Sequence, residues 1–348
     1  MSIWKAFRGG LRLLGRNKRI LFWMWGLSLL LALAPTLLVS RSIKHSLGNS
    51  FKAEKLAQGY DDIWFQEFEA DAQALASTFE PTVAGAGAVF KALDGFVSGT
   101  LFKQFPAILA VGIAYLLLWA FAAGGILTAF EKNISPSFEE FAAAGARYLG
   151  RFVRLMVFVG LLYWLIYALL APWLDEWFES LSADTIDERL ALLWKVFTLL
   201  IFLAAVWLVN ILADYAKILT VLERRRSMLL SLLRSVRLCA AHFLRVGGLY
   251  LLVTLLGIVL MAIYALVAPG ASDSTWTGVL LALLLGQIYI AARIGVRLLF
   301  FASQMELCRS LIAAPEPAPM TEPPIASEPL LPPQEDHLED AAAPEQEA

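Results

Sequence analysis

Six long apolar runs limit what this chain can fold into. Each has about the 20 residues that an α-helix needs to cross a bilayer, and lipid favours helices because they satisfy their own backbone hydrogen bonds. Of the 348 residues, 59% are hydrophobic and 17% are charged, far from the usual soluble balance. We therefore predict an all-α integral membrane protein whose six transmembrane helices cover residues 20–40, 105–130, 155–174, 194–213, 246–268 and 276–302.

The charges between the runs predict how the chain is threaded. Residues 214–245 carry seven Lys or Arg against two acidic residues, whereas residues 175–189 carry six acidic residues against one Arg. The long segment 41–104 is also net acidic, with six Lys or Arg against eight Asp or Glu. Because positive loops stay in the cytoplasm, both termini are expected there.

The first 19 residues are predicted to form an amphipathic helix on the cytoplasmic membrane surface. Basic residues surround an apolar face, although Gly9-Gly10 weakens the helix. A cleaved signal peptide is the rival interpretation of the first run, but the run is too long and Pro35 would obstruct cleavage after Ala34. The predicted apolar face consists of Ile3, Trp4, Phe7, Leu11 and Leu14.

Three further segments carry local structural signals. Residues 122–125, Ala-Ala-Gly-Gly, give the second run a small face suited to close helix packing. Ser137 and Glu140 have capping-box spacing and predict the start of a short helix before the third run. In the segment 41–104, residues 52–78 look like an amphipathic helix. Residues 81–102 either lie on the outer interface or dip into the bundle as a re-entrant hairpin.

The basic segment 214–245 is predicted to be a cytoplasmic helical elbow with a break near Ser227. Five of its arginines are candidate contacts for anionic lipid, each contributing about 1 kcal/mol near the surface; topology determination alone is the alternative. The last 36 residues hold nine Asp or Glu and neither Lys nor Arg, so a disordered tail, 313–348, available to a protein partner, is expected. The candidate lipid contacts are Arg224, Arg225, Arg226, Arg234 and Arg237.

The strongest polar signal inside a run is the pair Arg293 and Arg297, which the i,i+4 spacing places on one helix face. Arginine at this depth is costly unless it is paired or snorkels to the surface. One hypothesis is a site for an anionic headgroup or substrate between the fourth and sixth helices. The alternative is a structural ion pair. The candidate cluster is Asn210, Asp214, Arg293 and Arg297, with Glu306 as a further partner; Gln287 and Tyr289 are candidates for interhelical hydrogen bonds.

Motifs for catalysis or metal binding are missing from the sequence. The three histidines are scattered, and there is neither a phosphate-binding glycine loop nor a Gly-x-Ser-x-Gly nucleophile motif. Cys239 and Cys308 fall in segments assigned to the reducing side, so a disulfide is not expected. We therefore predict a protein that is not an enzyme, with no cofactor, metal or nucleic acid partner.

Three polar segments give the chain a resemblance to a known type of protein. They read D-Y-A-K-x5-E-R-R-R-S, S-F-E-E-F-x4-A-R-Y-L-G-R-F-x-R and Q-I-Y-I-x-A-R-I-G-V-R-L-L-F-x-A-S-Q. The plan resembles a group of bacterial six-span inner-membrane proteins and the membrane domain of some glycerophosphodiester phosphodiesterases. The resemblance implies a location in the bacterial inner membrane. No hydrolase domain is present, so no phosphodiesterase activity carries over.

Two functional hypotheses follow. The first is a non-catalytic scaffold or accessory protein in envelope or lipid homeostasis, whose partner is the bilayer and its anionic lipids. The alternative is a small-solute or lipid permease with a cavity near Arg293. A dry, tightly packed bundle favours the scaffold, whereas a re-entrant hairpin over residues 81–102 and a water-filled cavity that reaches Arg293 favour transport.

Overall fold

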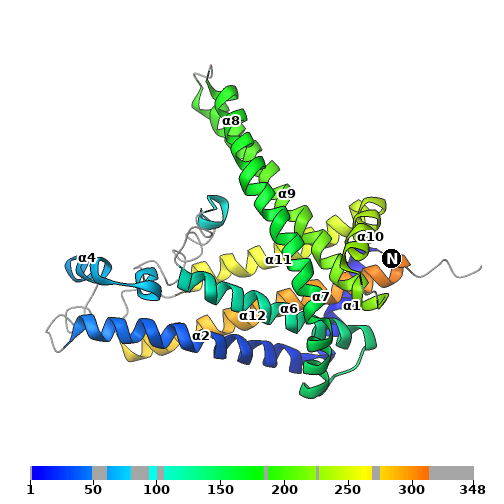
Figure 1. Cartoon of the computed structure of the whole chain (residues 1–348), viewed down its shortest axis with the longest axis horizontal. Coiled ribbons are helices and arrows are strands. Elements are labelled where there is room, and N and C mark those ends of the chain that lie inside the picture. The colour runs from blue at the N-terminus through cyan, green and yellow to red at the C-terminus, as the bar shows by residue number, and fades with distance from the viewer. Residues whose placement is uncertain are drawn as a thin grey trace, which may run out of the picture. The chain divides into compact units, whose positions relative to one another are not determined.

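The computed structural model describes residues 2–48, 61–79, 94–99, 106–183, 187–224, 227–268 and 275–312. Within those ranges every regular element is helical, and six helices are long and apolar enough to cross a membrane. The predicted all-α architecture with six spans is therefore confirmed (Figure 1). The acidic tail, residues 313–348, lies outside the described residues.

The six spanning helices are joined by shorter elements at their ends. The spanning helices are α2 (Lys18–Leu47), α6 (Pro106–Lys132), α7 (Phe138–Leu165) with its continuation α8 (Ala171–Ser182), α9 (Glu188–Leu222), α11 (Phe243–Val267) and α12 (Trp276–Ile312). The shorter elements are α1 (Ile3–Arg16), α4 (Asp62–Asp71), the 3-10 helix η1 (Ala74–Thr78), the π-helical turn η4 (Ile166–Leu170) and α10 (Met228–Ala241).

Most spanning helices extend beyond the apolar runs, because residues with good helix propensity continue them. The predicted short helix before the third run is part of α7 itself, which the Ser137–Glu140 capping box opens. The predicted break near Ser227 separates α9 from α10, and Arg224 there adopts a φ of 49°. The predicted helix over 52–78 is shorter: α4 begins at Asp62, and residues 51–60 lie outside the described ranges.

Small residues let the spanning helices α6 and α7 approach each other closely. Ala122 and Ala123 are buried, and a Cβ atom on Gly125 would lie 2.7 Å from the carbonyl oxygen of Phe141. A Cβ atom on Gly145 would likewise lie 2.8 Å from the carbonyl oxygen of Phe121. The small face predicted from the sequence is therefore a helix-packing surface.

The amino-terminal helix α1 packs along the last part of α12. Ala6, Gly10 and Leu13 are buried, and a Cβ atom at Gly10 would lie 2.7 Å from the backbone nitrogen of Ser303. Of the predicted apolar face, Ile3, Phe7 and Leu14 pack against the core, whereas Trp4 and Leu11 are exposed. Gly10, expected to weaken the helix, is the residue that permits its contact with α12.

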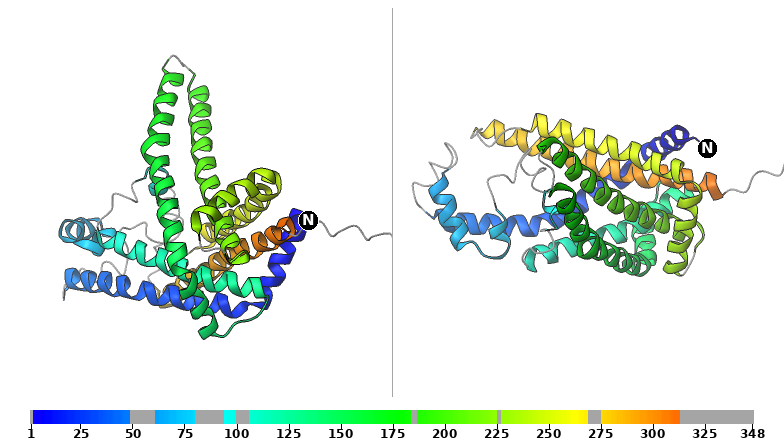
Figure 2. Two further views of the ribbon diagram at one scale, coloured as in Figure 1. Left: turned by 45° about the vertical axis from the view of Figure 1, so that its right-hand side comes forward. Right: turned by 90° about the horizontal axis from the view of Figure 1, so that it is seen from above.

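One end of the bundle gathers the basic elements. Helix α1 packs there on α12 and on the start of α11, where the Ile3 side chain would meet a Cβ atom on Gly248 at 2.7 Å. Helix α10 is tied to the end of α9 by an ion pair of 2.6 Å between Arg234 and Glu223. Figures 1 and 2 show α1, α10 and the end of α12 together; we call this the basic end.

A second apolar cluster joins α7, η4, α8 and α9. Pro172 lacks the N–H that a regular helix would use, and the chain passes through the π-helical turn η4 immediately before it. Ile166, Leu174 and Phe202 form the centre of this cluster. In Figures 1 and 2, α8 and the first half of α9 pair with each other and lean away from α2.

Candidate functional site

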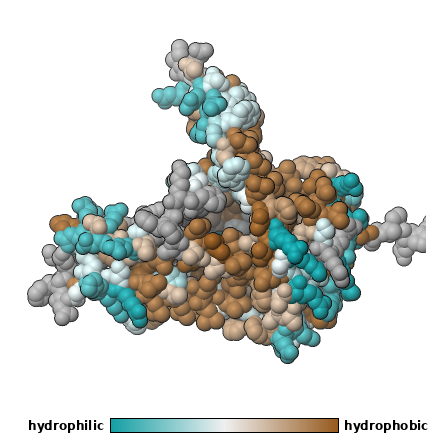
Figure 3. Space-filling view, viewed as in Figure 1, coloured by the Kyte–Doolittle hydropathy of each residue, from teal (hydrophilic) through white to brown (hydrophobic). Residues whose placement is uncertain are grey.

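A cavity of about 880 Å³ lies between five of the spanning helices. Its walls come from α2, α6, α9, α11 and α12, and Phe96 closes part of one side. The molecular surface is hollowed beside the foot of the α8–α9 pair (Figure 3). The volume falls within the range of small-molecule sites, about 300–1,000 Å³.

All four residues of the polar cluster proposed from the sequence line this cavity. Asn210 and Asp214 reach it from the second half of α9, and Arg293 and Arg297 reach it from the middle of α12. Lys217, one turn beyond Asp214, joins them. The cavity therefore carries three cationic side chains against one carboxylate, and its net charge favours an anion.

The expected ion pair between Asp214 and Arg293 does not form. The carboxylate of Asp214 instead accepts a hydrogen bond of 2.8 Å from the ammonium of Lys217 in the same helix. The i,i+3 spacing brings these two groups together without any tertiary contact. Lys217 also lies over the ring of Phe301, 5.6 Å from its centroid. Because Asp214 and Lys217 form an ion pair, their charges offset each other.

Arg297 is held by an aromatic ring. Its guanidinium carbon lies 4.0 Å from the centroid of the Trp119 ring, which α6 supplies. This cation–π contact engages the flat face of the guanidinium and leaves the N–H groups at its edge free to bind an acceptor. Trp119 therefore orients Arg297 without neutralising its charge.

Arg293 differs from the other cations of the cavity. Its side chain is exposed towards the cavity, and no hydrogen bond, ion pair or ring contact joins it to another described residue. A guanidinium that is both inside a helix bundle and without a carboxylate partner is costly in lipid. An anion bound in the cavity would offset that cost.

Aromatic residues line the part of the cavity further from the basic end. The rings of Tyr264 on α11 and Tyr289 on α12 are stacked, with centroids 4.1 Å apart. Beside them, the indole N–H of Trp25 donates a hydrogen bond of 2.9 Å to the side-chain oxygen of Gln287. The predicted interhelical role of Gln287 is confirmed, whereas Tyr289 is part of the cavity wall.

The candidate lipid contacts of the basic elbow fall into different environments. Arg234 is paired with Glu223 at 2.6 Å, and Arg224 lies 3.9 Å from Glu131 while remaining highly exposed. Arg237 is exposed on α10 and has no ion pair with a described residue. Arg225 and Arg226 lie outside the described residues, as does most of the segment 81–102 proposed as a re-entrant hairpin.

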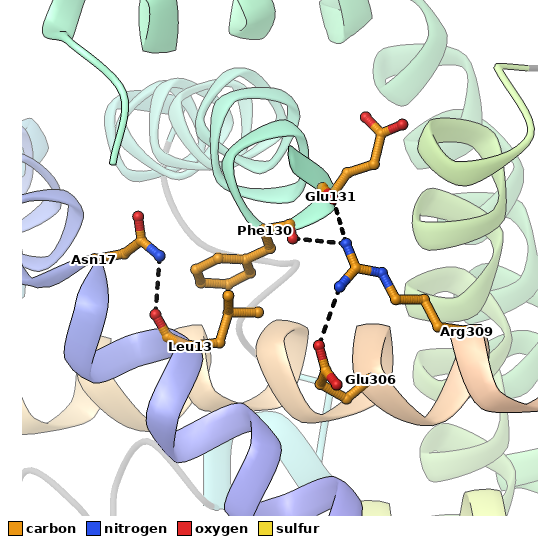
Figure 4. A network of polar contacts seen from close by, with 6 residues as sticks. All are labelled: Leu13, Asn17, Phe130, Glu131, Glu306 and Arg309. Atoms are coloured by element: carbon orange, nitrogen blue, oxygen red, sulfur yellow. Dashed lines mark hydrogen bonds and ion pairs between the residues drawn. The ribbon is translucent and has the colours of Figure 1, made fainter. Parts of the chain in front are cut away.

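Sequence reasoning missed the role of Arg309, near the end of α12. Its guanidinium donates to the carbonyl oxygen of Phe130 at 2.8 Å and to that of Glu131, both in the last turn of α6 (Figure 4). It also pairs with Glu306 at 3.1 Å, so Glu306, a proposed partner of Arg293, is engaged elsewhere. The contact joins segments far apart in sequence, and no local signal predicts it.

The remaining chemistry-bearing groups do not cluster in the described ranges. Both cysteines are free and buried, and burial raises the pKa of the Cys239 thiol on α10 to about 12. No group of three His, Cys, Asp or Glu side chains in those ranges is placed to hold a metal ion.

Comparison with known proteins found no matching family model, no similar curated protein and no similar solved structure. The resemblance to bacterial six-span membrane proteins therefore stays a prediction.

Proposed function

We propose that the protein is a multi-pass permease that binds an anionic solute or an anionic lipid headgroup beside Arg293. The observation that carries the proposal is the guanidinium of Arg293, which is paired with no other described residue and lines a cavity of about 880 Å³. Of the two hypotheses from the sequence, the scaffold needs a closed bundle and the permease needs a cavity at this residue. The cavity supports the permease.

The distribution of charge in the site supports an anion as the ligand. Lys217 and Asp214 form an internal pair, so Arg293 and Arg297 determine the net charge that a ligand meets. Two guanidinium groups one helical turn apart repel each other, and an anion bound between them would offset that repulsion. A cation would have to displace Lys217 from the single carboxylate.

The proposal includes a membrane orientation and a location. The basic end, with α1 and α10, would face the cytoplasm, and the membrane would be the bacterial inner membrane. The excess of Lys and Arg at that end supports the orientation. The cations of the cavity would then lie near the cytoplasmic boundary, and a bound anion would be held at that depth within the membrane.

The test is cysteine labelling in sealed vesicles. Cys239 and Cys308 are replaced by alanine, and single cysteines are introduced at Ile290, which lines the cavity, and at Leu284, which is exposed on the same helix outside it. Membrane-impermeant thiosulfonate reagents are added to each face in turn. Labelling of Ile290→Cys but not of Leu284→Cys is expected. Shielding of both cysteines from both faces would indicate a closed bundle and would return the scaffold to first place.

A further inference from the structure

The cavity is long, and it is charged at one end only. Helix α12 lines it from Gly286 to Phe301, fifteen residues apart, which is about 22 Å along the helix. The four formal charges belong to residues 214, 217, 293 and 297, nearer the basic end. The other half is lined by uncharged residues, among them Leu260, Met261 and Tyr264. A compact inorganic anion would leave this uncharged half empty.

The charged end offers two guanidinium groups on one helix face. Arg293 and Arg297 both line the cavity, one turn apart on α12. Each guanidinium presents several N–H donors in a planar fork. A phosphate group, with several acceptor oxygens around one centre, can accept hydrogen bonds from both guanidinium groups at once.

Helices α9 and α11 each contribute to the wall of the cavity and carry exposed apolar side chains. The two helices meet at Trp207, whose ring lies 5.8 Å from that of Tyr250 and fills the space over Gly247. Past that contact their apolar side chains are exposed, including Leu199 and Leu203 on α9 and Leu255 on α11. The hydrocarbon chain of a ligand would therefore meet an apolar surface on both helices.

We propose that the ligand is an amphiphile that carries a phosphate group and enters the cavity between α9 and α11. Its phosphate lies against Arg293 and Arg297, and its hydrocarbon chain follows the uncharged half towards Gly286. The inference rests on the proposed function and specifies the substrate class of the same site.

The test compares ligands and variants of the full chain in a neutral detergent by thermal unfolding. The ligands are palmitoyl lysophosphatidylglycerol, the zwitterionic palmitoyl lysophosphatidylcholine and inorganic phosphate. Arg293→Gln removes the headgroup contact, and Arg189→Gln removes the same charge from the exposed start of α9, far from the candidate lipid contacts. Gly286→Leu fills the uncharged half, where a Cβ atom meets nothing within 4 Å, and Gly112→Leu is its control outside the cavity.

The anionic lysolipid should raise the unfolding midpoint at concentrations at least tenfold lower than the zwitterionic lysolipid or phosphate. Arg293→Gln and Gly286→Leu should each weaken that effect at least tenfold, while Arg189→Gln and Gly112→Leu leave it unchanged. If phosphate stabilises the protein as well as the lysolipid does, and Gly286→Leu has no effect, the amphiphile is wrong and a soluble anion remains. If no ligand effect depends on Arg293, the proposed function fails as well.

Discussion

The guanidinium of Arg297 lies 4.0 Å from the centroid of the Trp119 ring, and this contact joins α12 to α6 at the wall of the cavity. It holds a positive charge in place where the two helices meet. Arg293, one turn earlier, has no such contact with a described residue. The pair therefore combines one oriented guanidinium with one that is free to engage a ligand.

The first prediction concerns the energy of the Trp119–Arg297 contact. A double-mutant cycle with Trp119→Leu and Arg297→Met should give a coupling free energy of about 1–2 kcal/mol, as expected for a partly desolvated cation–π pair. The free energy of unfolding in detergent provides the measurement. Trp119→Phe should keep part of the coupling because it retains an aromatic face. Additive effects of the two substitutions would contradict the contact.

The second prediction separates the true partner of Asp214 from the expected one. Asp214→Asn and Lys217→Met should be coupled by about 0.5–1 kcal/mol, since their side chains form an ion pair of 2.8 Å. Asp214→Asn and Arg293→Gln should be additive within about 0.5 kcal/mol. In ligand-free detergent, Arg293→Gln alone should not lower the free energy of unfolding. A strong Asp214–Arg293 coupling would restore the structural ion pair.

The third prediction tests the docking of α1 on α12. Gly10→Ala should destabilise the protein by about 1–3 kcal/mol, because the added Cβ atom would lie 2.7 Å from the backbone nitrogen of Ser303. Gly15→Ala in the same helix is the matched control, since a Cβ atom there meets nothing within 4 Å. It should be neutral or stabilising by up to about 1 kcal/mol. Equal thermal midpoints for the two variants would show that α1 does not pack as described.

The fourth prediction concerns the Cys239 thiol. Burial raises its pKa from 9.0 to about 12, which favours the neutral thiol in the folded protein. The stability from this effect is full below pH 9 and declines as the pH rises towards 12. At pH 7.5 maleimide should label Cys239 at least tenfold more slowly in the folded than in the denatured protein, because the thiolate is the reactive form. Equal rates would place the thiol at the surface.

The number and type of the spanning helices could be predicted from the sequence, because the thickness of a bilayer sets the number of apolar residues in each spanning helix. The extent of the helices could not, since α7 and α9 continue with polar residues beyond their apolar runs. Hydropathy measures what favours lipid and says little about helix propensity. Helix propensity alone also misjudged Gly10. It was expected to weaken α1, but its lack of a side chain permits the packing of α1 on α12.

The candidate site was predictable in its charges and not in its contacts. Depth along the spans is enough to place Asp214 near Arg293, because both lie a similar distance from the basic loops. The pairing of Asp214 with Lys217 follows from i,i+3 spacing and could have been found. The contact of Trp119 with Arg297 depends on the rotation of α6 about its axis, which a uniformly apolar span does not reveal.

The central claim is that the cavity beside Arg293 attracts anions, and the most direct test is the charge selectivity of a cysteine at Ile290. The labelling rate of Ile290→Cys is measured with an anionic and with a cationic thiosulfonate, each relative to a free thiol. The account predicts a preference for the anionic reagent of at least tenfold, equivalent to about 1.4 kcal/mol, which Arg293→Gln reduces. A preference for the cationic reagent, or a ratio that Arg293→Gln leaves unchanged, would contradict it.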